Sequence, residues 1–316
     1  MNKNNPYQND KVYEDEITLI ELFALFWDKK KFIISITLIS AILAILYSLS
    51  LPNLYTSRAL LIPSEPQDGL SSKIGGLSSL GGIAGISFPE TNISKSKEAI
   101  QRIKSHEFFY NFLLPNIELE NLMAVKKWNE AENTIIYDDE IYNSNTKEWV
   151  RDMTYSKTKI PSSQEAYEEF RKILLINQDN KTSFVNISIE HQSPIIAKKW
   201  TEMIIKEVNQ SMRAEDQSQA KKSISYLSEA QQSTNIQSIK EVTSLLLEDQ
   251  MQTLMLTSSN ENYVFKIIDS PLVSEKKSAP NRSIIVIITT LLGFTLSIIF
   301  VFIQHLINKF GFLRER

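Results

Sequence analysis

The residue types that most often perform enzymatic chemistry are scattered along this sequence. The three histidines, His106, His191 and His305, lie far apart, and none has a second metal-ligand type nearby at the spacing of a metal site. The acidic run Asp138–Glu140 lacks the spacing of a calcium-binding loop, so we expect a solvated turn there. We expect the histidines to be ordinary surface or capping residues, and we predict no metal site.

No candidate nucleophile or phosphate-binding loop is found either. The Ser-x-x-Lys pattern of some acyl enzymes occurs in four unrelated contexts, at Ser94, Ser156, Ser218 and Ser274, and we interpret it as chance. Glycines are concentrated in residues 69–85, but no Gly-Lys-Ser/Thr follows them. Because isoleucine and leucine are interleaved with these glycines, we expect a loop that packs on another surface, such as a neighbouring subunit. The sequence predicts neither an enzyme nor a cofactor.

The overall composition excludes several further classes. The net charge of −3 gives no basic excess for binding nucleic acid. The absence of cysteine excludes disulfides, cysteine-ligated zinc and thiol catalysis. The mean hydropathy of −0.17 is that of a soluble protein, but it averages over two apolar blocks near the ends. These two blocks therefore decide the class of the protein.

Both apolar blocks are long enough to cross a bilayer. The first, residues 32–51, has about 20 residues without a charge, which span ~30 Å of hydrocarbon as a helix. A buried core helix is disfavoured because no polar face interrupts the run. A cleaved signal peptide is disfavoured because the preceding tail is long and contains acidic residues. The second block, residues 283–307, also fits a membrane span.

Positively charged residues flank both blocks on the same side. They occur in Asp28–Lys31 before the first block and in residues 308–316 after the second. Because such residues favour the cytoplasmic side, we expect both chain ends in the cytoplasm and residues 52–282 exported. Few residues follow the second block, so we expect no cytoplasmic kinase or ATPase domain there.

The stretch between the blocks mixes strand and helix periodicities. These patterns predict strands at 54–63, 183–190 and 262–269 and helices at 94–115 and 162–174. Ser162 and Glu165 form a predicted capping box at the start of the second of these helices. Residues 128–160 keep no period, so we expect an irregular region. Because the first and last strands adjoin the membrane helices, we expect them to pair in one sheet.

The longest helical stretch begins at Ser193, a natural N-cap with proline in the next position. Between residues 211 and 223 the apolar pattern nearly vanishes, so this part must be extended in water or packed on another helix or chain. A single helix over 194–257 would be ~95 Å long and would carry the last strand far from the membrane. Capping-box patterns beginning at Thr234 and Ser238 predict a break, so that the helix returns as a hairpin.

Several segments, in this order, resemble the Wzz family of chain-length determinants, which are polysaccharide co-polymerases without a kinase domain. The resemblance covers nearly the whole chain. It rests on "DEITLIELFALFWDKKKFI", "YTSRALLIP", "AVKKWNEAENTIIYDDEIY", "SSQEAYEEFRKIL", "FVNISIEHQSPIIAKKW" and "NYVFKIIDSP". The segment "DSPLVSEKKSAPNR" resembles the proline-rich approach to the second membrane span in that family.

The resemblance implies a ring-like homo-oligomer in the inner membrane of a Gram-negative bacterium. Members of the family set the modal length of a polysaccharide, typically lipopolysaccharide O-antigen, which a separate polymerase in the same membrane makes. They perform no bond chemistry themselves, and contact with lipid-linked polysaccharide is possible. The geometry of the oligomer would then determine when elongation stops.

The predicted fold is α+β. Two transmembrane helices flank a periplasmic domain that has a membrane-proximal α/β base and an extended α-helical hairpin. The predicted segments are a cytoplasmic tail at 1–31, a transmembrane helix at 32–51, the periplasmic domain at 52–282, a transmembrane helix at 283–307 and a cytoplasmic tail at 308–316. Within the periplasmic domain, the base comprises about 52–192 and 258–282, and the helical arm about 193–257.

The resemblance also suggests candidate contact residues. Contacts with the polymerase or with another membrane span are predicted for Pro271, Pro280, Gly293 and Ser297, since small residues four apart let helices approach closely. The family usually has further prolines in this segment, where this chain has Ser274 and Lys277. An interface between copies of the chain is predicted for apolar residues of the long helical stretch: Trp200, Ile204, Val208, Ile224 and Leu227.

Alternative functions stay open at this point. The first is an export adaptor or chain-length regulator for capsule, exopolysaccharide or enterobacterial common antigen. Adaptors of that kind usually carry a kinase or have an outer-membrane partner. A periplasmic sensor would need an output domain, and an enzyme would need the catalytic residues that the sequence does not group.

Overall fold

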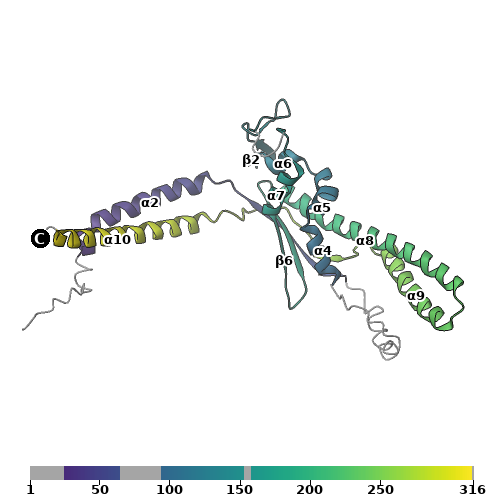
Figure 1. Ribbon diagram of the computed structural model, residues 1–316. Helices are drawn as coiled ribbons and strands as arrows, with labels where there is room; N and C mark the ends of the chain where they lie inside the picture. The colour runs from purple at the N-terminus through teal and green to yellow at the C-terminus, as the bar shows by residue number, and fades with distance from the viewer. Residues whose placement is uncertain (1–24, 65–93, 153–157, 315–316) are drawn as a thin grey trace, which may run out of the picture. The chain divides into compact units, whose positions relative to one another are not determined.

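A computed structural model of the chain describes residues 25–64, 94–152 and 158–314 (Figure 1). The glycine-rich residues 69–85 lie outside the described residues. The chain divides into two compact units. The first unit is made from the two ends of the chain, up to Leu51 and from Pro280 onward, and the second is Pro52–Ala279.

The first unit is a pair of helices, α2 (Lys30–Ser50) and α10 (Arg282–Arg314), which pack against each other. Both are long and apolar enough to cross a membrane, over 21 residues in Lys30–Ser50 and 26 in Arg282–Ile307. Most of their apolar side chains face outward, as they do in helices surrounded by lipid and not in the core helices of soluble domains. Helices therefore form at both apolar blocks of the sequence.

The second unit is built on a four-stranded antiparallel sheet with the strand order β6-β7-β1-β8. Its strands are β1 (Tyr55–Pro63), β6 (Leu174–Gln178), β7 (Val185–His191) and β8 (Phe265–Asp269). The predicted strands at 54–63, 183–190 and 262–269 are confirmed as β1, β7 and β8. The predicted pairing of the first and last strands is also confirmed, since β1 pairs with β8.

Alternation of side chains along the strands gives the sheet one buried face. On β1, Ser57, Ala59 and Leu61 are buried, while Arg58, between Ser57 and Ala59, is exposed. The buried face is covered by the first half of α8 (Pro194–Ser233), which contacts β1 and β7. Ser193 caps this helix as predicted, because its hydroxyl accepts a hydrogen bond from the backbone N–H of Ile196.

Short helices complete the core of this unit. They are α4 (Lys95–Ile103), α5 (His106–Phe108), the π-turn η1 (Phe109–Leu113), the 3₁₀ turn η2 (Leu114–Asn116), α6 (Leu119–Met123) and α7 (Ser163–Ile173). The prediction of a single helix over 94–115 is wrong, because a new helix, α5, begins after Ser105. The Ser105 hydroxyl caps it by accepting a hydrogen bond from the N–H of Phe108. The capping box of Ser162 and Glu165 on α7 is confirmed. Strand β6, which follows α7 without a loop, was not predicted.

The region expected to be irregular contains two small hairpins. Strand β2 (Val125–Asn129) pairs with β3 (Thr134–Tyr137), and β4 (Tyr142–Asn143) pairs with β5 (Glu148–Trp149). An aromatic contact holds the second hairpin together, with the rings of Tyr142 and Trp149 5.2 Å apart. Strands this short do not produce a lasting period-2 pattern, which is why the sequence did not reveal them.

A helical hairpin leaves the sheet, as predicted. Helix α8 continues past the core to Ser233, and α9 (Gln237–Ser259) returns along it (Figure 1). The break lies at residues 234–236, within the predicted range. The two capping boxes predicted there are wrong, because Ile236 precedes α9 and provides no side-chain cap. The mixed fold with a helical hairpin and two candidate membrane helices is thus confirmed.

Candidate functional site

The small residues of the two apolar helices lie at the contact between them. On α10, Gly293 lies so close to α2 that an added Cβ atom would be 2.5 Å from the Cβ atom of Ser40. The Ser40 hydroxyl donates to the Thr289 carbonyl at 3.0 Å. Ser297 and, on α2, Ala44 are also buried in the first unit. The predicted close-approach motif is therefore used here by a helix of the same chain.

The two predicted proline positions lie on either side of the connection to α10. Pro271 is buried, and next to it the hydroxyl of Ser57 on β1 donates to the Leu272 carbonyl at 2.8 Å. Farther along, the N–H of Leu54 donates to the Ala279 carbonyl at 2.8 Å, immediately before the half-buried Pro280. Backbone bonds therefore hold this connection beside the start of β1. Whether Pro271 and Pro280 contact a polymerase stays a prediction.

Three of the predicted interface residues lie in the core of the second unit. Ile204 and Val208 are fully buried, and Trp200 is 2% exposed. Their apolar stripe faces the sheet and short helices of the same chain. These three side chains are consequently not available on the surface for a neighbouring copy, and the interface prediction is restricted to Ile224 and Leu227, which are half-buried on α8.

A buried asparagine joins α8 to the edge strand of the sheet. The side-chain oxygen of Asn209, Oδ1, accepts hydrogen bonds from the backbone N–H groups of Val264 (2.7 Å) and Phe265 (2.9 Å). Its amide donates to the carbonyls of Phe265 and Ile205, both at 3.1 Å. Asn209 is 5% exposed, so these bonds are shielded from water. They fix the end of the α9–β8 connection to α8.

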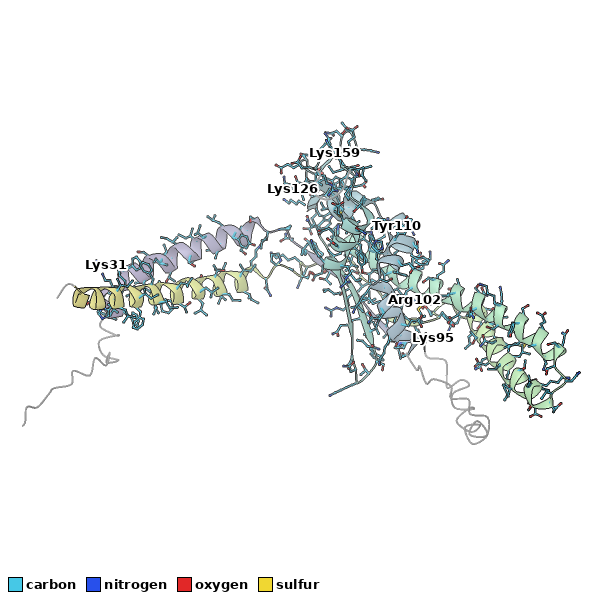
Figure 2. The ribbon with its side chains drawn as sticks, in the orientation of Figure 1. Lys31, Lys95, Arg102, Tyr110, Lys126 and Lys159 are labelled. Carbon is cyan, nitrogen blue, oxygen red and sulfur yellow. The ribbon has the colours of Figure 1, made fainter. Side chains whose placement is uncertain are left out.

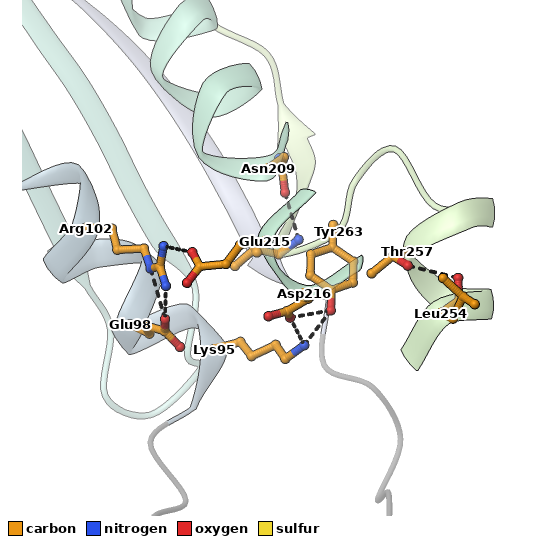
Figure 3. Close-up of polar contacts among 10 residues, drawn as sticks. Lys95, Glu98, Arg102, Asn209, Glu215, Asp216, Leu254, Thr257 and Tyr263 are labelled. Carbon is orange, nitrogen blue, oxygen red and sulfur yellow. Dashed lines mark hydrogen bonds and ion pairs between the residues drawn. The ribbon is translucent and has the colours of Figure 1, made fainter. Parts of the chain in front are cut away.

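Immediately beyond Asn209 on α8, a polar cluster ties three segments together (Figure 3). The Lys95 ammonium donates to Asp216 Oδ2 and to the Tyr263 hydroxyl, each at 2.6 Å. The Tyr263 hydroxyl in turn donates to Asp216 at 2.6 Å. Burial lowers the pKa of Lys95, but the bonds to Asp216 and Tyr263 outweigh burial and raise it above its ordinary value. Lys95 is thus held as a cation.

A second cation of α4 completes this cluster. Arg102 donates to Glu98 on its own helix at 2.7 and 2.9 Å and pairs with Glu215 on α8. Figure 2 shows Lys95 and Arg102 on α4 beside α8. We call Lys95, Glu98, Arg102, Glu215, Asp216 and Tyr263 the root cluster, because they lie where the hairpin leaves the core. No motif in the sequence singled out these residues.

The described histidine and carboxylate side chains form no group that could bind a metal ion. Within 25–64, 94–152 and 158–314, no group of three His, Asp or Glu side chains could hold a metal ion. His191 is buried and structural. Its Nε2 atom contacts the Asn121 carbonyl at 2.8 Å, and its Nδ1 atom accepts from the Ser193 N–H at 2.9 Å. Its ring lies edge-on to Trp200 at 5.2 Å.

Because His191 is buried, the stability of the folded chain should decline when the pH falls below about 6.5. Burial lowers the pKa of His191 in the folded chain, so the unfolded chain takes up a proton first and is favoured by acid. The stabilisation from neutral His191 should be complete above pH 6.5 and be lost progressively as the pH falls toward the lowered pKa. Thermal unfolding of the full chain in detergent, followed by tryptophan fluorescence between pH 7.5 and 5.5, would measure this. His191→Gln should flatten the profile and His106→Gln should not; equal slopes in all three proteins would contradict it.

Two protein-family models match the sequence, one toward each end of the chain. The sequence matches the family model Wzz, "Chain length determinant protein", over residues 15–113. It also matches the model GNVR, "G-rich domain on putative tyrosine kinase", over residues 227–306. The first match covers α2, β1 and the short helices up to η1, and the second covers the end of α8, α9, β8 and most of α10. No curated protein sequence matches the chain.

Two solved structures are similar over most of the chain. One is described as a full-length bacterial polysaccharide co-polymerase; it is 15% identical, with 92% of this chain and 99% of that chain covered and a TM-score of 0.38. The other is a fragment of WzzB, a polysaccharide co-polymerase from Salmonella Typhimurium; it is 14% identical, with 72% of this chain and 100% of that chain covered and a TM-score of 0.28. The similarity of the chain to known families accordingly rests on the two sequence models.

Proposed function

We propose that the chain, which matches the Wzz chain-length determinant model over residues 15–113, regulates the modal length of lipopolysaccharide O-antigen as a non-enzymatic co-polymerase. A separate polymerase in the same membrane would make the bonds. The observation that supports this proposal most directly is the combination of the Wzz match over residues 15–113 with two candidate membrane helices, one near each end of the chain.

The proposed location is the bacterial inner membrane. Helices α2 and α10 would cross it, with both chain ends in the cytoplasm and residues 52–282 in the periplasm. The three consecutive lysines at the start of α2, Lys29–Lys31, support this orientation, because basic residues favour the cytoplasmic side. In this arrangement the predicted domain boundaries separate two short tails, two spans, the base and the helical arm.

The proposed mechanism is geometric. Copies of the chain would assemble into a ring-like homo-oligomer that holds polymerases or growing chains near one another, and the shape of the oligomer would set when elongation ends. The helical hairpin supports this proposal, since it carries exposed apolar side chains that a solitary domain would bury or replace. Pro271 and Pro280 stay proposed contacts with the polymerase, while the role proposed for Gly293 and Ser297 is to hold α10 against α2 within one copy.

The surface proposed for contact between copies is one side of α9. Leu247, Met251 and Met255 follow one another at four-residue spacing and line a shallow groove. Met255 is 71% exposed and Met251 is 53% exposed. A second copy of this chain is the proposed occupant, and Ile224 and Leu227, which are half-buried on α8, stay proposed contacts between copies.

Replacing Met255 by glutamate should reduce assembly without unfolding the chain. An exposed side chain contributes little within one copy, whereas a charge in an apolar interface must be desolvated without a partner. We expect the assembled fraction to fall at least tenfold, measured as molar mass by light scattering in detergent. Met255→Leu keeps the apolar surface and should assemble as the wild type does. If Met255→Glu assembles fully, this side of α9 is not the interface.

A second candidate function is favoured by one observation. The GNVR model, which matches residues 227–306, is described as a domain on tyrosine kinases. We therefore retain the proposal that the chain is an export adaptor or length regulator for capsule, exopolysaccharide or enterobacterial common antigen. The two proposals differ in which polysaccharide changes when the gene is removed.

Deletion and complementation of the gene would test both proposals. The lipopolysaccharide of the deletion strain should lose its preferred O-antigen length on a gel, and the wild-type gene should restore it. Capsule and common antigen, analysed in the same strains, should be unchanged under the first proposal. An altered capsule with unaltered O-antigen would favour the second, and unaltered polysaccharides throughout would refute length control.

A further inference from the structure

The root cluster lies at the point where the hairpin loses the support of the core. Along α8, the side chains that belong to the hydrophobic core end at Met212, and the next two acidic residues, Glu215 and Asp216, bind the cations of α4. On the returning leg, α9 ends at Ser259 and Tyr263 joins the cluster four residues later. Helix α4 therefore binds both the outgoing helix α8 and the segment that follows the returning helix α9.

Lys95 is the shared link. Its ammonium group binds Asp216 on the outgoing leg and Tyr263 after the returning leg, and it lies 4.6 Å from the centre of the Tyr263 ring. The Lys95 and Asp216 side chains are 36% and 33% exposed, and Tyr263 is 7% exposed. Partial burial strengthens these bonds relative to those of fully exposed ion pairs. One side chain of α4 thus fixes two segments that lie far apart in the sequence.

Arg102 adds a second attachment about two helical turns after Lys95 on α4. It is held by Glu98 on its own helix, which fixes the direction of the guanidinium group before it meets Glu215. Two attachments on one rigid helix restrict rotation of α8 as well as its displacement. By contrast, the pair of Lys172 and Glu169 on α7 joins neighbours within one helix and restrains nothing else.

We propose that the root cluster fixes the direction of the helical hairpin relative to the sheet and is thereby a determinant of the polysaccharide length. This inference rests on the proposed function. In an assembly of many copies, the direction of the hairpin sets the spacing of neighbouring hairpins, so a small change at the root is repeated in every copy. Residues that set the direction would control length without contacting sugar or polymerase.

Two readouts test this inference on the full chain. The chain has no cysteine, so spin labels can be placed at Asn235→Cys in the hairpin turn and Lys181→Cys in the turn between β6 and β7. Labelled chains diluted with unlabelled ones then report the distance within one copy. The second readout is the polysaccharide length distribution after complementation of the deletion strain. Lys172→Met serves as the matched control for Lys95→Met.

We expect Lys95→Met to broaden or shift the distance distribution and to displace or abolish the preferred polysaccharide length. Asp216→Asn, which nearly preserves shape, should do the same if Lys95→Met accumulates poorly. The double variant Lys95→Asp, Asp216→Lys restores an ion pair and should restore both readouts, and Lys172→Met should change neither.

The outcomes separate the two proposals. An unchanged distance distribution in Lys95→Met overturns the inference. So does a changed distance with an unchanged polysaccharide length, provided that the wild-type gene restores that length. If the wild-type gene restores no preferred length, the proposed function fails, while the distance measurement still decides whether the root cluster directs the hairpin.

Discussion

Replacement of Asn209 by leucine should destabilise the folded chain by about 3 to 9 kcal/mol. Leucine has a similar size but leaves the N–H groups of Val264 and Phe265 and the Phe265 carbonyl without their bonds to this side chain. Each unpaired buried group costs about 1–3 kcal/mol. Pro63, which lies opposite Phe265 in the sheet, has no N–H with which to replace the lost donor.

Urea unfolding of the full chain in detergent, followed by tryptophan fluorescence, would measure the loss for Asn209→Leu. Asn116→Leu is the matched control, because its exposed amide makes one bond to the Phe112 carbonyl. The free energy of unfolding of Asn116→Leu should fall by less than about 0.5 kcal/mol. If the two variants lose the same amount, Asn209 does not connect α8 to β8 in the way the structure indicates.

Replacement of Gly293 by leucine should separate α2 from α10. Even a Cβ atom at this position would meet the Cβ atom of Ser40, which cannot rotate away, so the helices must move apart. Overpacking of this kind costs about 1–3 kcal/mol, and we expect the paired population to fall on the order of 10- to 100-fold. The polysaccharide length control proposed above should be lost with it.

Crosslinking would measure helix pairing in Gly293→Leu. The rings of Phe32 and Phe300 stack with centroids 5.7 Å apart, so cysteines at these two positions should be joined by a short bifunctional maleimide in the parent protein. Thr295→Leu, which places the same leucine side chain on the exposed side of α10, should leave crosslinking intact. Undiminished crosslinking in Gly293→Leu would show that the close contact with Ser40 is not required for pairing.

Local signals in the sequence predicted the elements that depend on neighbouring residues. The capping box of Ser162 and Glu165, the cap at Ser193 and the alternation in β7 each involve residues within a few positions of one another. Their physical cause is therefore contained in a short window. The fold class followed from the order of these elements and from the two apolar blocks.

The contacts between distant segments could not be predicted in this way. Asn209 and Asp216 stand among polar residues of a long helix, and their partners are tens of residues away. Trp200 and Val208 form an apolar stripe, but a stripe does not say whether its own sheet or another copy covers it. The same holds for Gly293, whose neighbour is α2 of the same chain.

The pairing of β1 with β8 has a consequence for biosynthesis. Leu61 and Ile267 are opposite each other in the sheet, so the edge of β1 stays uncovered until nearly the entire chain has been translated. Such late, nonlocal pairing slows folding, and an open strand edge invites association with other nascent chains. Molecules cut short before Phe265 would lack the strand that closes this edge, and cellular quality control should remove them.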